Sequence, residues 1–363
     1  MSFPTGWTKK CSLTIDNTKV SGTTNLTNFP VLLTEANFPS TIFDNTQSAG
    51  QDLRFTSDEA GTTELAFEIV NWDTTNDKAE VWVKIPTVDY DNDTVFYVWY
   101  GNAGASAYGA TDTYGSQAVW GDYEGVWHLT NANDSSASGY NCTLGSGGQA
   151  PTSTAGLIGT ATTGAYDFEK SSSQYMYNNT VPNLVIATNQ TWQAWFKPEQ
   201  VDLERITFVC NSSVSGFAGI GVDDETGTAL ARTSFREIGT PAQNNIEGPT
   251  TIVVGNVYLI HGQLDATNRK GYTYVNGSGS VEDNSSDRDT ASGEVFAIGK
   301  LGAVEQYCDG VIDEVRVRAS VLSAGWIATE YNNQSSPATF VTEGTETDVG
   351  STGISASKRS INC

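Results

Sequence analysis

Paired carboxyl groups are the first side chains in this sequence that could do chemistry, because its 42 Asp and Glu residues outnumber its 19 Lys and Arg residues. Cleavage of a glycosidic bond needs two such groups, about 5–5.5 Å apart in retaining enzymes. Asp309 and Asp313 could share one face of a strand, and Glu314 would then point to the opposite face. One pair of this kind is a weak pattern, so we interpret the protein as non-enzymatic.

A second candidate chemistry is cation binding by a loop rich in oxygen ligands. Residues 131–139, NANDSSASG, combine Asn, Asp and Ser side chains with turn-forming residues. Calcium prefers six to eight oxygen ligands of this type. The alternative is that Asp134 caps a turn by accepting backbone N–H bonds. No EF-hand spacing occurs in the chain.

Histidine and cysteine offer little chemistry here. His128 and His261 lie in apolar, strand-like runs, and we expect both to be hydrogen-bonded in or beside a core. Nucleophile elbows and phosphate-binding glycine loops are absent from the sequence. The cysteines have no CxxC spacing, so we expect free thiols and no zinc site; they are Cys11, Cys142, Cys210, Cys308 and Cys363.

Aromatic side chains are the feature of the sequence that could bind carbohydrate, because the C–H faces of a sugar stack on flat apolar rings. Most tryptophans lie inside strand-like runs and are expected in the core; they are Trp82, Trp99, Trp127, Trp192 and Trp195. The tyrosines near turns are better candidates for exposed rings; they are Tyr140, Tyr175, Tyr177 and Tyr307.

The charge balance narrows the possible partners. The formal net charge is −23 at pH 7, whereas nucleic acids and anionic membranes attract basic surfaces. We therefore expect no nucleic-acid partner. No apolar run approaches the ~20 residues of a membrane span, so we expect no membrane insertion. The first residues lack the apolar stretch of a signal peptide.

The elements that must position these side chains are short strands. Val81, Val83 and Ile85 alternate with other residues and should share one face of a strand. Asn276-Gly277 follows an aromatic run and is the strongest hairpin signal. One helix is predicted near residues 323–331, with Ser at its start, and helix should form less than about a tenth of the chain.

This pattern predicts an all-β protein with two antiparallel β-sandwich domains and an extended C-terminal tail. We place the first domain at residues 1–105, a linker at 106–116, the second domain at 117–343 and the tail at 344–363. The tail has few apolar side chains, so order in it would require contacts with the first domain, a neighbouring copy or another protein. Cys363 could lock such a contact as a disulfide, with Cys11 as the candidate partner.

Four motifs follow one another in the first domain. They are Gln51-Asp52-Leu53-Arg54-Phe55, Phe67-Glu68-Ile69 with Trp72, Val81-Trp82-Val83-Lys84-Ile85-Pro86, and Tyr97-Val98-Trp99-Tyr100-Gly101-Asn102. With these motifs in the family's order, residues of about 5–104 resemble the DUF2341 family, a domain of unknown function in surface and secreted multidomain proteins and in some phage. The resemblance covers most of the first domain.

A second set of motifs follows in the second domain. They are Gly125-Val126-Trp127-His128-Leu129, Asp134-Ser135-Ser136, Ala165-Tyr166-Asp167-Phe168, Thr191-Trp192-Gln193-Ala194-Trp195-Phe196, Tyr274-Val275-Asn276-Gly277 and Asp309-Gly310-Val311-Ile312-Asp313-Glu314-Val315-Arg316-Val317. With these motifs, residues of about 120–343 resemble the laminin-G/concanavalin A-like jelly roll.

This resemblance implies two stacked antiparallel sheets, a glycan- or protein-binding role and often a structural calcium. It places Asp134 near the closing strand that carries Asp313, and a calcium ion bridging these two carboxylates is one prediction. The alternative is that Asp313 accepts backbone N–H bonds.

Together these observations favour a non-enzymatic structural or adhesive protein exposed to the extracellular medium. The favoured setting is the surface of a phage virion, as a head decoration, fibre or tail-associated protein. Its partners would be other virion or surface proteins, copies of itself and a cell-surface glycan. A secreted bacterial adhesin with a carbohydrate-binding module is one alternative. A polysaccharide hydrolase or lyase is another, and it would need a cleft with two convergent acids.

Overall fold

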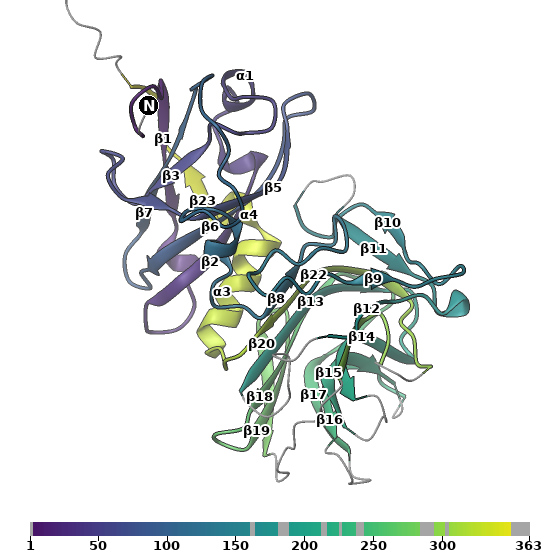
Figure 1. The fold of residues 1–363 in the computed structure, drawn as a ribbon. Coiled ribbons are helices and arrows are strands. Elements are labelled where there is room, and N and C mark those ends of the chain that lie inside the picture. The colour runs from purple at the N-terminus through teal and green to yellow at the C-terminus, as the bar shows by residue number, and fades with distance from the viewer. Residues whose placement is uncertain are drawn as a thin grey trace, which may run out of the picture.

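A computed structural model describes residues 3–159, 164–180, 189–211, 216–224, 227–236, 243–283, 294–301 and 305–349. Its strands pair antiparallel and build two β-sandwiches, one above the other in Figure 1, with the helix α3 (Ala324–Ser335) between them. Strands form 45% and helices 11% of the described residues. The all-β prediction is confirmed. No described helix is long and apolar enough to cross a membrane.

The first sandwich contains the elements before residue 120 and the last strands of the described chain. Its elements are β1 (Lys9–Ile15), β2 (Leu26–Thr34), α1 (Ile42–Asn45), β3 (Arg54–Thr56), β4 (Glu64–Leu65), β5 (Phe67–Asp73), β6 (Lys78–Val88), β7 (Thr94–Tyr100), α2 (Ser116–Val119), α4 (Pro337–Phe340), β23 (Val341–Glu343) and β24 (Thr347–Asp348). One sheet has the order β23-β1-β7-β3-β4, with β24 also paired to β1. The other has the order β2-β6-β5.

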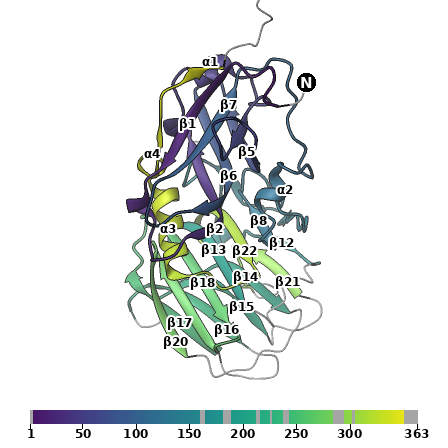
Figure 2. The ribbon, with the colours of Figure 1, turned by 90° about the vertical axis from the view of Figure 1, so that its left-hand side faces the viewer.

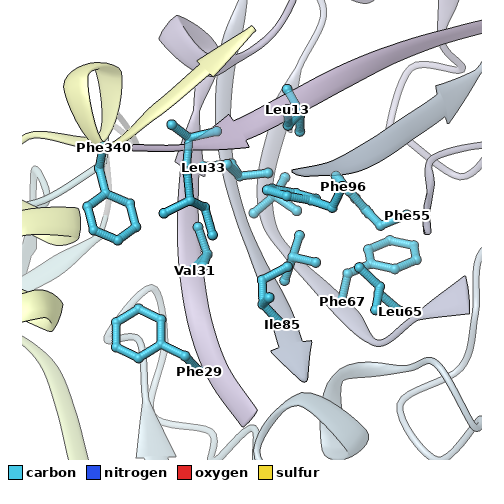
Figure 3. Packing of buried hydrophobic residues seen from close by; sticks show 14 of the residues in the cluster. Leu13, Phe29, Val31, Leu33, Phe55, Leu65, Phe67, Ile85, Phe96 and Phe340 are labelled. Atoms are coloured by element: carbon cyan, nitrogen blue, oxygen red, sulfur yellow. The ribbon is translucent and has the colours of Figure 1, made fainter. Parts of the chain in front are cut away.

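The pleat of β2 and β6 explains how the first core forms (Figure 3). Residues two apart on a strand share a face, and Val81, Val83 and Ile85 all lie in this core, as predicted. Leu32 and Trp82, on the opposite pleat, are equally buried but contact the second sandwich instead. The three-stranded sheet is therefore covered on both faces.

The second sandwich packs an eight-stranded sheet on a seven-stranded sheet. The first has the order β10-β11-β22-β13-β18-β19-β20 with β8 on β22, and the second has the order β17-β16-β15-β14-β21-β12-β9. The strands are β8 (Gly125–Trp127), β9 (Thr143–Leu144), β10 (Thr152–Thr154), β11 (Ala165–Phe168), β12 (Met176–Asn178), β13 (Gln190–Pro198), β14 (Leu203–Asn211), β15 (Phe217–Asp223), β16 (Leu230–Arg236), β17 (Gln243–Thr251), β18 (Tyr258–Asp265), β19 (Lys270–Val275), β20 (Ser278–Asp283), β21 (Glu294–Ile298) and β22 (Gly310–Arg318).

The Asn276-Gly277 hairpin is confirmed between β19 and β20. Both residues have positive φ, 51° and 81°, as a two-residue turn of this kind requires. The predicted helix is α3, and the Ser323 side chain caps it by accepting the backbone N–H of Trp326 at 3.1 Å. All five tryptophans expected in a core are buried.

The chain returns to the first sandwich after β22. The second domain was expected to extend to residue 343, but β22 is its last strand in the structure. The ring of Trp326 on α3 packs edge-on against Phe29 of β2 at 4.9 Å between centroids. Helix α4 lies beside the first sandwich (Figure 2), and its Phe340 is fully buried in the first core (Figure 3). Strand β23 then pairs with β1. The edge of β1 would otherwise expose unpaired backbone groups, and the returning segment covers it.

The tail contacts the first domain as far as the structure describes it. The Lys9 side chain binds Glu346 at 2.7 Å, and β24 pairs with β1 up to Asp348. Cys363 lies outside the described residues. Cys11, the candidate disulfide partner of Cys363, is only 1% exposed and its Sγ donates to the Gly344 carbonyl, so its thiol is poorly accessible for such a bond. It belongs to the inward face of β1.

Residues 106–116, expected to be a linker, lie along the first sandwich. The Tyr108 ring contacts Phe67 and Tyr114, and the Tyr114 carbonyl accepts the backbone N–H of Phe67. Because two aromatic side chains in this segment bury apolar surface, it packs on the domain instead of joining two domains freely.

Candidate functional site

Three tyrosine rings lie side by side on the outer surface of the second sandwich. Met176 of β12 points into the core, so Tyr175 and Tyr177 on either side of it point outward. Their ring centroids are 5.4 Å apart, and the Tyr307 ring lies 6.2 Å from Tyr175. All three are half-buried. We call Tyr175, Tyr177 and Tyr307 the tyrosine face.

Polar groups adjoin the tyrosine face. The Lys300 ammonium lies 3.8 Å from the centroid of the Tyr175 ring and 5.8 Å from that of Tyr307. A cavity of about 480 Å³ opens beside Tyr307. Its other lining residues are Lys170, Ser173, Asp202, Leu203, Glu305 and Gln306. Flat rings beside hydrogen-bonding donors and acceptors are the combination that a sugar needs.

Two carboxyl groups near this cavity have divergent pKa values. The Lys170 ammonium binds Asp202 at 2.7 Å and Glu204 at 3.3 Å. The hydrogen bond with Glu204 lowers the pKa of Asp202, whereas burial and that same bond raise the pKa of Glu204 to about 8. Such a pair could do acid–base chemistry, but the Glu204 side chain is fully buried and its carboxylate accepts the backbone N–H of Asp309. The geometry favours a structural role.

Of the four candidate tyrosines, the structure brings three together and buries the fourth. Tyr140 is 8% exposed and belongs to the core of the second sandwich. The sequence could not reveal this grouping, because Tyr307 comes from the segment before β22, far along the chain from β12. The Asp202 and Glu204 pair was also missed, although acids two residues apart at the start of a strand are a readable signal.

A β-bulge in β22 places three charged side chains on the face toward the first sandwich. Glu314 and Val315 lie opposite a single residue of β13, and Glu314 has a φ of 49°. Val315 therefore enters the core while Asp313, Glu314 and Arg316 all point outward. The expectation that Glu314 points away from Asp313 is wrong, because the bulge shifts the alternation by one residue.

His128 joins the two sandwiches through two carboxylates. Its Nδ1 lies 2.5 Å from Glu314 and its Nε2 lies 3.1 Å from Glu68 of β5. Burial alone would lower the pKa of His128, but the charges of Glu314 and Glu68 outweigh it and hold that pKa well above its ordinary value. The predicted hydrogen-bonded histidine is confirmed, and His261 is likewise buried, 3.0 Å from Glu330 of α3.

Glu80 and Asp313 are two acids of this interface whose pKa values are raised. Burial and the charge of Glu314 raise the pKa of Glu80 to about 8. Burial, Glu314 and Glu80 raise the pKa of Asp313 as well. Arg316 forms ion pairs with Glu314 and Glu330, and its guanidinium lies 4.0 Å from the Trp82 ring centroid. The buried interface therefore raises the pKa of two neighbouring acids.

Two groups of described side chains have ligand atoms close enough for a metal ion. One is Glu80, His128 and Glu314, whose ligand atoms lie within 4.8 Å of one another. Both nitrogens of His128 already bind carboxylates. Neither nitrogen is therefore available to bind a metal ion unless one of these bonds breaks. The other is the half-buried to exposed set of Asp167, Glu169 and Glu199.

The predicted calcium ligands have backbone partners. Asp134 accepts the N–H groups of Val126 at 2.9 Å, Ser136 at 2.8 Å and Tyr140 at 2.8 Å. Asp313 accepts the N–H groups of Leu157 at 2.7 Å and Ile158 at 3.2 Å. The alternative interpretation was that both carboxylates accept backbone N–H bonds, and the structure contains such bonds for both residues. A calcium ion bridging Asp134 and Asp313 stays a prediction.

Asp309 and Asp313, the carboxylates considered for catalysis, are both buried, 5% and 2% exposed. They also have different partners. Asp309 accepts from the Gln200 amide, whereas Asp313 binds the backbone at residues 157 and 158. Neither side chain is presented to a polymer at the surface.

The fold and these side chains define a pair of β-sandwiches joined by a buried charged interface. Residues 170–328 match the concanavalin A-like lectin/glucanases superfamily. Residues 49–121 match DUF2341, a domain of unknown function. The chain thus contains a DUF2341 region followed by a concanavalin A-like domain, in the order predicted.

Solved structures with a similar chain trace include three from different sources. Domain 4 of AbnA, an extracellular arabinanase from Geobacillus stearothermophilus in complex with arabinotriose, is 18% identical with a TM-score of 0.42, over 57% of this chain and 97% of that one. The ligand-binding domain of botulinum neurotoxin serotype D in complex with N-acetylneuraminic acid is 14% identical with a TM-score of 0.42, over 59% and 51%. A pentraxin from Limulus polyphemus is 15% identical with a TM-score of 0.33, over 39% and 69%. No curated protein matches the chain.

Proposed function

We propose that the second sandwich binds carbohydrate through the tyrosine face, and that the protein is a non-enzymatic adhesive or structural protein. The observation that carries the proposal is the grouping of Tyr175, Tyr177 and Tyr307 beside a polar cavity. The match to a superfamily of lectins and glucanases supports the same ligand class.

The chemistry of the tyrosine face fits a neutral sugar, or one that carries a basic group. A pyranose ring would stack its C–H groups on Tyr177 or Tyr307, while Gln306, Ser173 and Asp202 offer partners for its hydroxyl groups. Burying about 50 Å² of apolar ring surface contributes roughly 1.3 kcal/mol. Each ring should therefore account for about a tenfold change in affinity.

A glycan array followed by calorimetry on the best glycan tests this proposal. Tyr177→Ala and Tyr307→Ala should each weaken binding about tenfold. Tyr90→Ala is the matched control, because Tyr90 is 38% exposed and lies on the first sandwich. Equal affinity of all three variants and the parent protein would show that the tyrosine face is not the binding surface.

A polysaccharide hydrolase or lyase is the competing function, and the divergent pKa values of Asp202 and Glu204 are the observation that favours it. The burial of Glu204 speaks against it. Release of reducing ends from a bound polysaccharide, abolished by Asp202→Asn, would replace the adhesive function by the enzymatic one.

The extracellular setting belongs to the same proposal. We place the protein on a phage virion, with a secreted bacterial adhesin as the alternative. The acidic charge of −23 suits a soluble exposed surface. Mass spectrometry of purified phage particles and of the bacterial surface fraction distinguishes the two, and detection only inside cells would contradict both.

A further inference from the structure

Two neighbouring cavities lie in the first sandwich under residues 102–110. One, of about 360 Å³, is lined by Trp7, Arg54, Asn102 and residues 104–108. The other, of about 420 Å³, lies along β5 and includes Phe67 and Trp72 in its lining. Ala107 and Tyr108 line both cavities, so an elongated ligand could extend from one to the other.

Arg54 is a buried cation, and no ion pair joins it to an acid among the described residues. Its side chain is 5% exposed. Nη1 donates to the carbonyls of Gln51 and Leu53, and Nη2 donates to the carbonyl of Ser106. Among the described residues, the Nε–H, which is fully buried, has no hydrogen-bond partner. Nε–H and Nη2 form the edge of a guanidinium that receives a carboxylate in side-on pairing.

Aromatic rings flank this cation. The guanidinium carbon lies 4.0 Å from the Tyr108 ring centroid and 5.2 Å from the Trp7 ring centroid. The rings stabilise the charge by cation–π contact, and the Tyr108 hydroxyl is also hydrogen-bonded to the Arg54 side chain. That hydroxyl donates to the nearby acid Glu64 at 2.5 Å. The cavity thus combines flat apolar walls with one unused charged donor, the Arg54 Nε–H.

We propose that this cavity binds the carboxylate of an acidic sugar, with Arg54 as the anion-binding residue. The sugar ring would lie against Trp7 and Tyr108, and a second sugar would enter the cavity along β5. There, the side chains of Gln51 and Asn71 supply amide groups for hydroxyls. With a net charge of −23 the protein does not attract anions in general, so recognition depends on this local cation. The site is separate from the tyrosine face and does not depend on it.

Ligand-detected NMR and calorimetry with three probes test the proposal on the full chain. The probes are D-glucuronic acid, methyl α-D-glucoside as its neutral counterpart, and N-acetylglycine as a carboxylate without a sugar ring. Glucuronic acid should bind at least tenfold tighter than either of the others. Adding Tyr177→Ala as a background variant leaves this preference unchanged, which separates the result from that of the tyrosine face.

Two variants and one control locate the site. Arg54→Lys should weaken glucuronic acid at least tenfold. Arg54 also donates to three backbone carbonyls, so replacing it could disturb the local fold. A second variant, Ala107→Trp, leaves Arg54 in place, fills the wall that both cavities share and should abolish binding. Ala103→Trp, exposed in the same segment but outside the linings, is the matched control and should bind normally.

Three results would overturn the proposal. One is the absence of glucuronic acid binding to the parent protein. Another is equal binding by the Ala107→Trp and Ala103→Trp variants, which would place the ligand elsewhere. A third is binding of N-acetylglycine as tight as that of glucuronic acid, which would assign the cavity to carboxylates such as peptide C-termini instead of acidic sugars.

Discussion

Replacing Glu80 by glutamine should remove a large pH dependence from the stability of this protein. Glu80 is 3% exposed on β6 and faces Glu314 and Asp313 across the interface between the sandwiches. Its closest polar partner is the Trp82 indole N–H at 3.4 Å, a long hydrogen bond. Burial and the charge of Glu314 raise its pKa from 4.5 to about 8.

The sign and size follow from proton linkage. Between pH 4.5 and about 8 the folded protein keeps the Glu80 proton that the unfolded chain has lost. The free energy of unfolding should then fall by about 1.4 kcal/mol per pH unit as the pH rises through this window. The whole shift corresponds to roughly 5 kcal/mol. His128, whose pKa is also raised, adds loss of stability in the same direction above its ordinary pKa.

Urea unfolding at pH 5, 6, 7, 8 and 9 measures the effect. The Glu80→Gln variant stays neutral at every pH, so its stability relative to the parent should increase steadily from pH 5 to 8. Both proteins retain His128 and its contribution. Glu59→Gln is the matched control, since the Glu59 side chain is 70% exposed. Parallel stability profiles of parent and Glu80→Gln would refute the reasoning that Glu80 is protonated in the folded state.

Three further predictions concern calcium, packing and thiol reactivity. If a calcium ion bridges Asp134 and Asp313, EDTA should lower the Tm, and Asp134→Asn should abolish this response. An unchanged Tm in EDTA would show that no such ion contributes to stability. Phe340→Ala should lower the free energy of unfolding by about 3–5 kcal/mol, measured by urea titration, and a loss below about 1 kcal/mol would contradict its place in the first core. Native Cys11 should not react with a thiol reagent at pH 8, because burial raises its pKa to about 11; rapid labelling before unfolding would contradict this.

Local pattern was sufficient for most of the secondary structure. Alternation identified the core face of β6, and an Asn-Gly pair identified the β19–β20 hairpin because both positions need positive φ. A serine followed by a helical apolar pattern located α3. Strands such as β17 and β20 were missed, since their sequences are polar and lack a clear alternation.

The placement of the chain after β22 could not be predicted from the sequence. Residues 337–348 have no signal that distinguishes packing on one sandwich from packing on the other. Their position is decided by the free edge of β1 and by the apolar face of β2, which are hundreds of residues earlier in the chain.

The sequence by itself determined the two β-sandwiches, the order of the two domains and the types of side chain available for binding. Tertiary structure alone decided which of these side chains meet. A one-residue bulge put Glu314 beside Asp313 instead of opposite it, and strand pairing brought Tyr307 to Tyr175 and Tyr177. Burial and the charge of Glu314 then raised the pKa of Glu80. The physical reason is that hydrophobic alternation and turn chemistry act between near neighbours, whereas charge, desolvation and ring contacts depend on distances that only the folded chain sets.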